Sequence, residues 1–298
     1  MTLIEINHLT KNYGSERGIF DINLSIEKGQ SFGFVGTNGA GKSTTIRHLM
    51  GFLKPQKGNA TIDGLDCWHQ SSEIMKKVGY IPGEIAFPDA KTGEAFLKGQ
   101  ADLLGIKDMT YANSLIEKLQ LDPTANLKRM SKGMKQKTAI VAALIAEPEI
   151  LIFDEPTTGL DPLMREIFVE IIEEERKKGR TIFMSSHMFD EVEELCDQVA
   201  LIKEGRIVAV KSTEDIKHNE NKNFKIEFKS IGDYERFVQE DFDFKETRVD
   251  RNQVIFNLND HEVNRLFKTL KNYDVKFMKE NKYTLEQYFN NLYSEGNK

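Results

Sequence analysis

A glycine-rich stretch near the N-terminus has the spacing GxxxxGK[ST], in which a lysine and a hydroxyl residue follow the last glycine. Its residues are Gly36, Thr37, Asn38, Gly39, Ala40, Gly41, Lys42, Ser43 and Thr44. Glycines let backbone N–H groups turn inward around phosphate oxygens without a Cβ in the way. The stretch therefore predicts a phosphate-binding loop, with Lys42 bridging β- and γ-phosphates and Ser43 offering its hydroxyl to Mg²⁺.

The segments around this loop favour the phosphate site over a glycine-rich turn that matches the spacing by chance. Phe32–Val35 predicts a short buried strand before the loop, and Ser43–Phe52 predicts a helix after it. A helix that begins at the loop would direct its positive N-terminal end at the same anion.

Two acidic residues, Asp154 and Glu155, directly follow the apolar run Ile150–Phe153, which predicts another buried strand. Unpaired buried charge is costly, and a bound Mg²⁺ would offset that cost. Asp154 would then hold the ion, while Glu155 would position and polarise the attacking water. A solvated turn is the alternative, but the phosphate loop upstream favours the metal.

With these motifs in place, Leu3 to Val210 resembles the nucleotide-binding domains of ABC transporters, and the implied cofactors are ATP and Mg²⁺. Met130–Met134 is similar to the family's signature motif, with SKGM where the commonest form has SGGQ. This variant is similar to that of the drug-, bacteriocin- and lipid-exporting branches. The resemblance implies that Ser131 and the Gly133 amide reach across a dimer to the other subunit's γ-phosphate, as a helix N-terminus could.

Three more residues take roles from the same resemblance. Asp161, in Gly159-Leu-Asp-Pro162, resembles the D-loop that lies along the dimer seam. His187 resembles the switch histidine that contacts γ-phosphate, which would make it a catalytic residue with Lys42 and Glu155. Tyr13 resembles the aromatic residue that stacks on adenine; taken alone, it would be an ordinary turn tyrosine.

One position departs from the family pattern. Where the family usually has a glutamine that touches Mg²⁺ or its water, after the strand Val78–Ile81, this chain has Gly83 followed by Glu84. Gly83 has no side chain for the task. Either Glu84 takes the metal role, or Glu84 is a solvated loop residue that faces the permease.

The predicted elements give an α/β fold around a P-loop nucleotide-hydrolase core. Alternating apolar residues predict N-terminal strands that form an antiparallel β-subdomain, with a turn at Tyr13-Gly14. Strands separated by helices then predict a mostly parallel sheet. Residues 93–146 read as helical with a break at Pro123, so a helical subdomain is expected at about residues 85–147.

A polar run at Ser212–Asn223 predicts a boundary between an ATP-binding domain, residues 1–212, and a small C-terminal accessory domain, residues 213–298. The second domain has a ferredoxin-like βαββαβ order, hence an α+β fold. Its ending, Thr284–Phe289, resembles the TLE-x-x-F ending of some exporters in the family, and the capping-box spacing predicts a last helix there.

Bulk properties limit the partners. The 298 residues include 41 Lys plus Arg against 47 Asp plus Glu, a net charge of −6, which disfavours nucleic acid. No apolar stretch approaches the ~20 residues of a membrane span, and no signal peptide is evident. The two cysteines form no metal-binding pattern.

The function implied by the resemblance is an ATP-hydrolysing motor that drives a separate membrane permease, most simply an exporter. The expected partners are a second copy or a paralogous subunit, and the permease that would place the chain on the inner face of the cell membrane. A non-transport ABC-family ATPase and a regulatory ATP-binding protein are the alternatives. Residues 51–130 show no sustained heptads, and Lys42, Asp154, Glu155 and His187 are all retained, which disfavours both.

Overall fold

The computed structural model describes residues 1–217, 221–281 and 284–295 and divides the chain into two compact units, Met1–Ser212 and Thr213–Lys298. Unit 1 therefore ends at the first residue of the polar run expected to separate two domains. Residues 218–220 of that run lie outside the described residues.

A six-stranded sheet forms the centre of unit 1, with strand order β10-β9-β3-β8-β7-β6. Its strands are β3 (Ser31–Val35), β6 (Val78–Ile81), β7 (Ile150–Asp154), β8 (Thr181–Ser186), β9 (Gln198–Lys203) and β10 (Arg206–Ser212). Neighbours from β9 to β6 are parallel, and β10 is antiparallel to β9. Every residue of β3, β7 and β8 is buried, as expected for strands covered on both faces.

A second, antiparallel sheet has the order β2-β1-β4-β5. It contains β1 (Thr2–Gly14), β2 (Arg17–Glu27), β4 (Lys57–Ile62) and β5 (Leu65–Asp66). Its apolar residues join those of β3 and of the helix α1 in one core, so the predicted antiparallel β-subdomain is confirmed. The predicted turn at Tyr13-Gly14 is wrong: β1 continues through Gly14, and the chain turns at Ser15 and Glu16, which both have positive φ.

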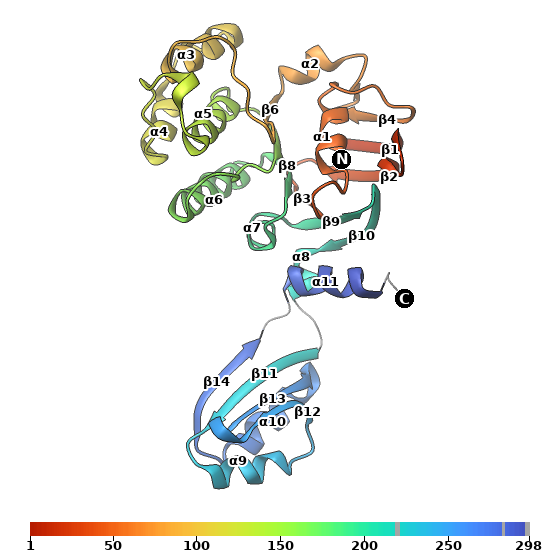
Figure 1. Cartoon of the computed structure of the whole chain (residues 1–298), viewed down its shortest axis with the longest axis vertical. Helices are drawn as coiled ribbons and strands as arrows, with labels where there is room; N and C mark the ends of the chain where they lie inside the picture. Colours follow the sequence, from red (N-terminus) through yellow and green to blue (C-terminus); the bar gives the residue numbers. More distant parts are fainter. Residues whose placement is uncertain (218–220, 282–283, 296–298) are drawn as a thin grey trace. The chain divides into compact units, whose positions relative to one another are not determined.

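The helices of unit 1 are α1 (Lys42–Leu49), α2 (Ser71–Met75), α3 (Gly93–Leu104), α4 (Thr110–Lys118), α5 (Lys132–Leu144), α6 (Pro162–Lys177) and α7 (Phe189–Leu195). Among them, α3, α4 and α5 lie together on the side away from the antiparallel strands, whereas α1 and α2 lie next to those strands (Figure 1). The predicted helical stretch 93–146 is three helices, because Gly105 ends α3 in the left-handed region and Pro123 lies in the next break. The helix predicted to reach Phe52 ends at Leu49, just before Gly51 with φ +69°.

Unit 2 contains a four-stranded antiparallel sheet of order β12-β13-β11-β14. Its elements are α8 (Thr213–Lys217), β11 (Asn221–Phe228), α9 (Ile231–Val238), β12 (Asp243–Arg248), β13 (Gln253–Asn259), α10 (Val263–Leu270), β14 (Val275–Asn281) and α11 (Leu285–Glu295). From β11 to β14 the order is βαββαβ, which confirms the predicted ferredoxin-like order. Fully buried Phe237 of α9 is the centre of an aromatic core that includes Phe228 and Phe256.

The contact between β6 and α5 requires a glycine and can be tested. A Cβ on Gly79 of β6 would lie 2.2 Å from the carbonyl oxygen of Ala143 in α5, a backbone atom that cannot move alone. We expect Gly79→Ala to lower the free energy of unfolding of unit 1 by about 2 kcal/mol or more. Gly99→Ala in α3 is the matched control: no atom lies within 4 Å of its added Cβ, so it should stabilise by about 0.5 kcal/mol.

Urea unfolding followed by the fluorescence of Trp68, the single tryptophan, reports on unit 1. Equal stability of the two alanine variants would contradict the close packing of β6 against α5.

Candidate functional site

The loop after β3 holds the side chain of Lys42 against its own backbone. Lys42 begins α1 and is 5% exposed. Its Nζ donates hydrogen bonds to the carbonyl oxygens of Gly36, at 2.7 Å, and Thr37, at 3.3 Å. Gly39 and Gly41 have φ +83° and +114°, a conformation that L side chains rarely adopt, so the loop needs glycine at both positions. Half-buried Ser43 follows in the first turn of α1.

The carboxylate of Asp154 lies at the carboxyl end of β7 and is 2% exposed. The hydroxyl of Ser185, from the neighbouring strand β8, donates to Oδ1 at 2.7 Å. A Cβ on Gly83 would lie only 2.9 Å from Oδ2. The glycine that replaces the family's glutamine is therefore the residue whose lack of a side chain leaves room beside this carboxylate.

The donor set fits Mg²⁺ better than a protein-enclosed metal. No group of three or more His, Cys, Asp or Glu that could hold a metal occurs in residues 1–217, 221–281 and 284–295. Mg²⁺ is commonly held by one or two protein oxygens together with phosphate and water oxygens. The Asp154 carboxylate and the Ser43 hydroxyl are hard oxygen donors of this kind.

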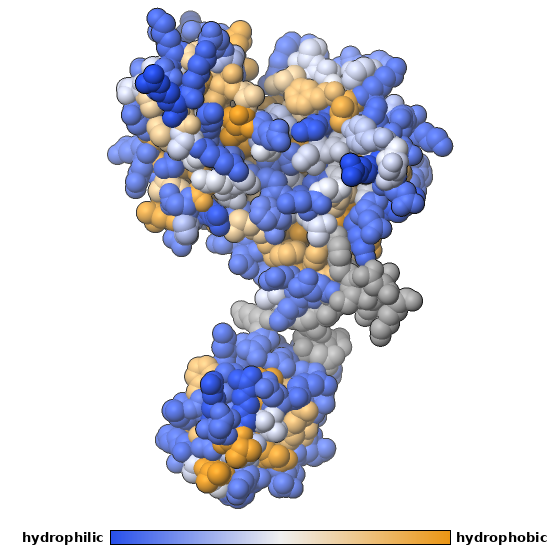
Figure 2. Space-filling model, in the orientation of Figure 1, coloured by the Kyte–Doolittle hydropathy of each residue, from blue (hydrophilic) through white to orange (hydrophobic). Residues whose placement is uncertain are grey.

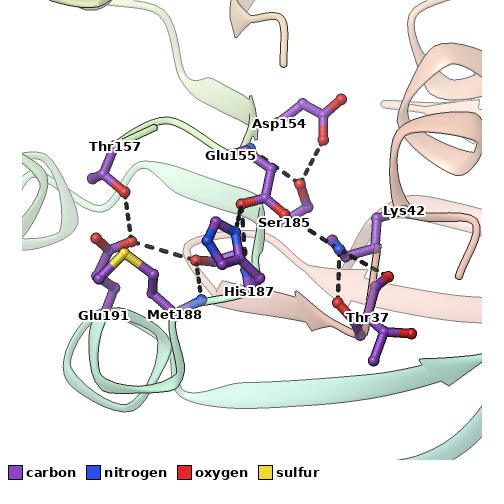
Figure 3. A network of polar contacts seen from close by, with 11 residues as sticks. Thr37, Lys42, Asp154, Glu155, Thr157, Ser185, His187, Met188 and Glu191 are labelled. Carbon is purple, nitrogen blue, oxygen red and sulfur yellow. Dashed lines mark hydrogen bonds and ion pairs between the residues drawn. The ribbon is translucent and has the colours of Figure 1, made fainter. Parts of the chain in front are cut away.

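Glu155 connects Lys42 of the phosphate loop to His187, which follows β8 (Figure 3). Its Oε1 forms an ion pair with Lys42 Nζ at 3.2 Å, and its Oε2 is in short contact with Nδ1 of His187. The His187 backbone N–H also donates to Oε2, at 3.3 Å. The structure thus brings together Lys42, Glu155 and His187, the three residues predicted to be catalytic.

The backbone of Glu155 has φ +54°, which is unusual for a residue other than glycine. Its N–H donates to the carbonyl oxygen and the hydroxyl of Ser185, at 3.1 and 3.2 Å. Strained conformations of this kind persist only where the surroundings enforce them, and they concentrate at functional sites.

The sequence analysis did not identify the carboxylate of Glu191, which is buried near the contact between Glu155 and His187. It accepts hydrogen bonds from the hydroxyls of Thr157, at 2.9 Å, and Ser186, at 3.4 Å. Glu191 belongs to an acid-rich segment, Asp190–Glu194, that reads as a solvated helix face. Only the fold of α7 shows that this one acid is buried.

The signature residues lie at the start of α5. The Ser131 hydroxyl accepts from the Met134 N–H at 3.2 Å and so caps the helix. A Cβ on Gly133 would lie 2.9 Å from the carbonyl oxygen of Gly159. Buried Gln136 donates to the carbonyl oxygen of Pro156 at 2.5 Å. The signature helix is therefore anchored on the segment that follows Glu155.

The remaining predicted site residues lie outside the Lys42–Glu155–His187 contacts. Exposed Asp161 caps α6, accepting from the Met164 N–H at 3.0 Å. The Tyr13 ring is 54% exposed, with Lys11 Nζ 5.9 Å from its centroid. Glu84 is exposed, and its carboxylate takes no part in the hydrogen bonds and ion pairs around Asp154 within the described residues.

None of the helices in the described ranges is both long and apolar enough to cross a membrane.

The chain is similar to known proteins that bind ATP, as expected from the residues of this site. Residues 19–158 match the family model described as "ABC transporter". The bacitracin transport ATP-binding protein BcrA of Bacillus licheniformis is 33% identical over 260 residues, covering 85% of this chain and 84% of that protein. The ABC transporter ATP-binding protein NatA of Bacillus subtilis is 36% identical over 217 residues, covering 70% and 88%.

Among solved structures, an ATP-binding subunit of an ABC transporter is 31% identical with a TM-score of 0.66, and the match covers 72% of this chain and 92% of that one. The glycine loop, the acidic strand end and the histidine lie in one site, and relatives above 30% identity align over most of their length. The chain belongs to the family of ABC transporter ATP-binding proteins.

Proposed function

We propose that this chain is the motor subunit of an ABC exporter, which binds ATP with Mg²⁺, dimerises on it and hydrolyses it to drive a separate membrane permease. The observation that carries the proposal is the Glu155 carboxylate, held between Lys42 and His187 beside the buried Asp154. A phosphate-binding cation, a base for water and a metal-binding acid are the parts that phosphoryl transfer requires.

The roles follow from the positions. Lys42 and the backbone N–H groups of Gly36–Thr44 bind the phosphates at the start of α1. Glu155 accepts a proton from the attacking water, and His187 orients the Glu155 carboxylate and contacts the γ-phosphate. Ser43 and Asp154 would hold Mg²⁺, which neutralises charge on the phosphate oxygens when bound.

A second copy would complete the site. Ser131 and Asp161 are exposed, and neither contacts Lys42, Glu155 or His187. The N-terminus of the 13-residue helix α5 is a ready anion site. Ser131, Gly133 and Asp161 of one copy are therefore proposed to face the nucleotide of the other copy, or of a paralogous subunit. Exposed Tyr13 would stack on adenine.

An apolar groove of about 250 Å³ between β6, α3 and α5 is the proposed contact with the permease. Tyr80, Pro82, Ile85, Phe87 and Phe96 are among its lining residues. Figure 2 shows hydrophobic residues gathered on the surface between the α3–α5 helices and α2. In the sequence, Gly83 lies between Pro82 and Ile85, which both line the groove. Gly83 also borders the Asp154 carboxylate. A partner bound in the groove would therefore act on the backbone next to Asp154.

Two further proposals concern location and organisation. Binding to a permease would place the chain on the inner face of the cell membrane. Residues 1–212, with a helical subdomain at about 85–147, form the ATP-binding domain, while 213–298 form an accessory domain.

Export is supported by the SKGM signature variant and by the similarity to BcrA, whose name assigns it to bacitracin transport.

The phosphate role of Lys42 predicts the effect of Lys42→Ala. Loss of the cation should weaken ATP binding at least ~10-fold and reduce hydrolysis by about 10²-fold or more. Phosphate release and titration with a fluorescent ATP analogue measure the two effects. Lys57→Ala removes an exposed lysine of β4 and should behave as wild type. Full hydrolysis by Lys42→Ala would refute the phosphate site.

The base role of Glu155 predicts a trapped dimer. Glu155→Gln keeps the side chain's size but cannot accept the proton, so hydrolysis should fall by about 10²- to 10⁴-fold. ATP binding should persist, because the change also removes a negative charge near the γ-phosphate. Size-exclusion chromatography at high protein concentration should show a dimer with Mg-ATP and a monomer without it. A variant that hydrolyses like wild type, or stays monomeric with Mg-ATP, contradicts the role.

The contact between Gly83 and Asp154 predicts a metal effect. In Gly83→Ala the added Cβ would meet Oδ2 of Asp154, so the carboxylate must shift. We expect the Mg²⁺ concentration that half-saturates ATP binding to rise at least ~3-fold.

The proposed metal role of Glu84 requires that this Mg²⁺ concentration also rises in Glu84→Ala. An unchanged titration would assign Glu84 to the solvent or the permease instead.

A further inference from the structure

Glu191 is a buried carboxylate in the first turn of α7. Its side chain is 6% exposed, and its two oxygens have unlike surroundings. Oε2 accepts hydrogen bonds from the hydroxyls of Thr157 and Ser186, which are themselves buried. Oε1 is also buried, and it has no hydrogen-bond partner among the described residues.

The two donors come from the two segments that carry the proposed catalytic pair. Thr157 lies two residues after Glu155, and Ser186 lies immediately before His187. The Ser186 hydroxyl also accepts from the Met188 N–H at 2.9 Å, so it braces the backbone on the far side of His187 as well. Glu191 thus bridges the same two segments that the Glu155–His187 contact joins at the surface (Figure 3).

Stability alone gives little reason for an acid at this position. Burial raises the pKa of Glu191, although the Thr157 hydroxyl and the charge of Arg165 counteract this. A carboxylate with one unpartnered oxygen costs free energy that an apolar side chain of similar volume would avoid. What the acid supplies is an acceptor that two hydroxyls from different segments can share.

We propose that Glu191 is a positioning residue for ATP hydrolysis: it clamps the segment after Glu155 to the segment before His187 and so holds the Glu155 carboxylate and the His187 ring in contact. The inference rests on the proposed function, because it presupposes that this pair activates water. Displacement of a catalytic group by about 1 Å can cost ~10²-fold in rate, so a contact behind the site can control turnover without touching ATP.

A positioning role of Glu191 and a purely structural role, in which Glu191 only attaches α7, predict different results. An attachment role predicts lower stability, with turnover and ATP affinity falling together as folded protein is lost. A positioning role predicts lower turnover at unchanged ATP affinity, because the hydrogen bonds of Glu191 within the described residues go to Thr157 and Ser186 and not to the phosphate loop or α1. It also predicts recovery with glutamine, whose carbonyl oxygen can accept from both hydroxyls.

The test uses the full chain with saturating Mg-ATP. Glu191→Leu should lower kcat by about 10- to 100-fold with the Kd for ATP within ~3-fold of wild type, whereas Glu191→Gln should keep kcat within ~3-fold. If Glu191→Leu does not fold, Thr157→Val removes one donor at constant shape. Thr157→Val should lower kcat by about 3- to 10-fold, with the Kd for ATP within ~3-fold of wild type. Glu194→Gln, on the exposed side of α7, is the matched control.

A double-mutant cycle identifies the target of the clamp. If Thr157 acts through the Glu155–His187 contact, Thr157→Val should reduce kcat by less than ~2-fold once His187 is alanine. Additive losses in the double variant would overturn the inference. So would wild-type kcat in both Glu191→Leu and Thr157→Val, or equal losses of turnover and ATP affinity.

Failure of the inference and failure of the proposed function are distinguishable. Absence of hydrolysis by wild type and by Glu194→Gln would overturn the proposed function and the clamp with it. Normal hydrolysis by both, with Glu191→Leu and Thr157→Val also normal, would overturn the clamp alone.

Discussion

The site depends on one carboxylate that serves two partners. Glu155 must reach Lys42, which follows β3, and His187, which follows β8, and it does so from the end of β7. Because β3, β8 and β7 are neighbouring parallel strands, their three carboxyl ends lie at the same edge of the sheet. The positive φ of Glu155 turns its side chain back over that edge, and two hydrogen bonds from its N–H to Ser185 hold the turn. The parallel sheet therefore positions the site residues as well as forming the core.

A second constraint connects the signature segment to the same carboxylate. Gln136 binds the carbonyl of Pro156, the residue after Glu155. Gly133 approaches the backbone of Gly159, and the methylenes of Lys132 cover the place where a Gly159 side chain would be. The Lys132 side chain thus packs on Gly159, in the segment predicted to be the D-loop. These contacts join the start of α5 to the residues that follow Glu155.

The site could be predicted from the sequence where its residues are close together in the chain. The phosphate loop and the Asp154-Glu155 pair follow from local spacing, because strand, loop and helix are consecutive there. The sequence could not show that Glu191 faces inward from an acid-rich helix, because its burial depends on Thr157 and Ser186, which are distant in the chain. Nor could it show that Gly83 lies beside Asp154, where an added Cβ would be 2.9 Å from Oδ2 of the carboxylate. The break at Pro123 was predicted, but the end of α3 at Gly105 was not, because a single glycine can also lie inside a helix, as Gly99 does in α3.

Unit 1 contains two buried glutamates outside the nucleotide site, and the contrast between them shows what each does. Glu175 is fully buried, but Lys178 Nζ lies 2.6 Å from its Oε1 and the Tyr111 hydroxyl donates to the same oxygen at 2.7 Å. These contacts join α4 to α6, and a charge so compensated is an ordinary structural link. Glu191 has two hydroxyl donors and, among the described residues, no ion pair. Because a buried acid without an ion pair is costly, Glu191 fits a positioning role better than a stabilising one.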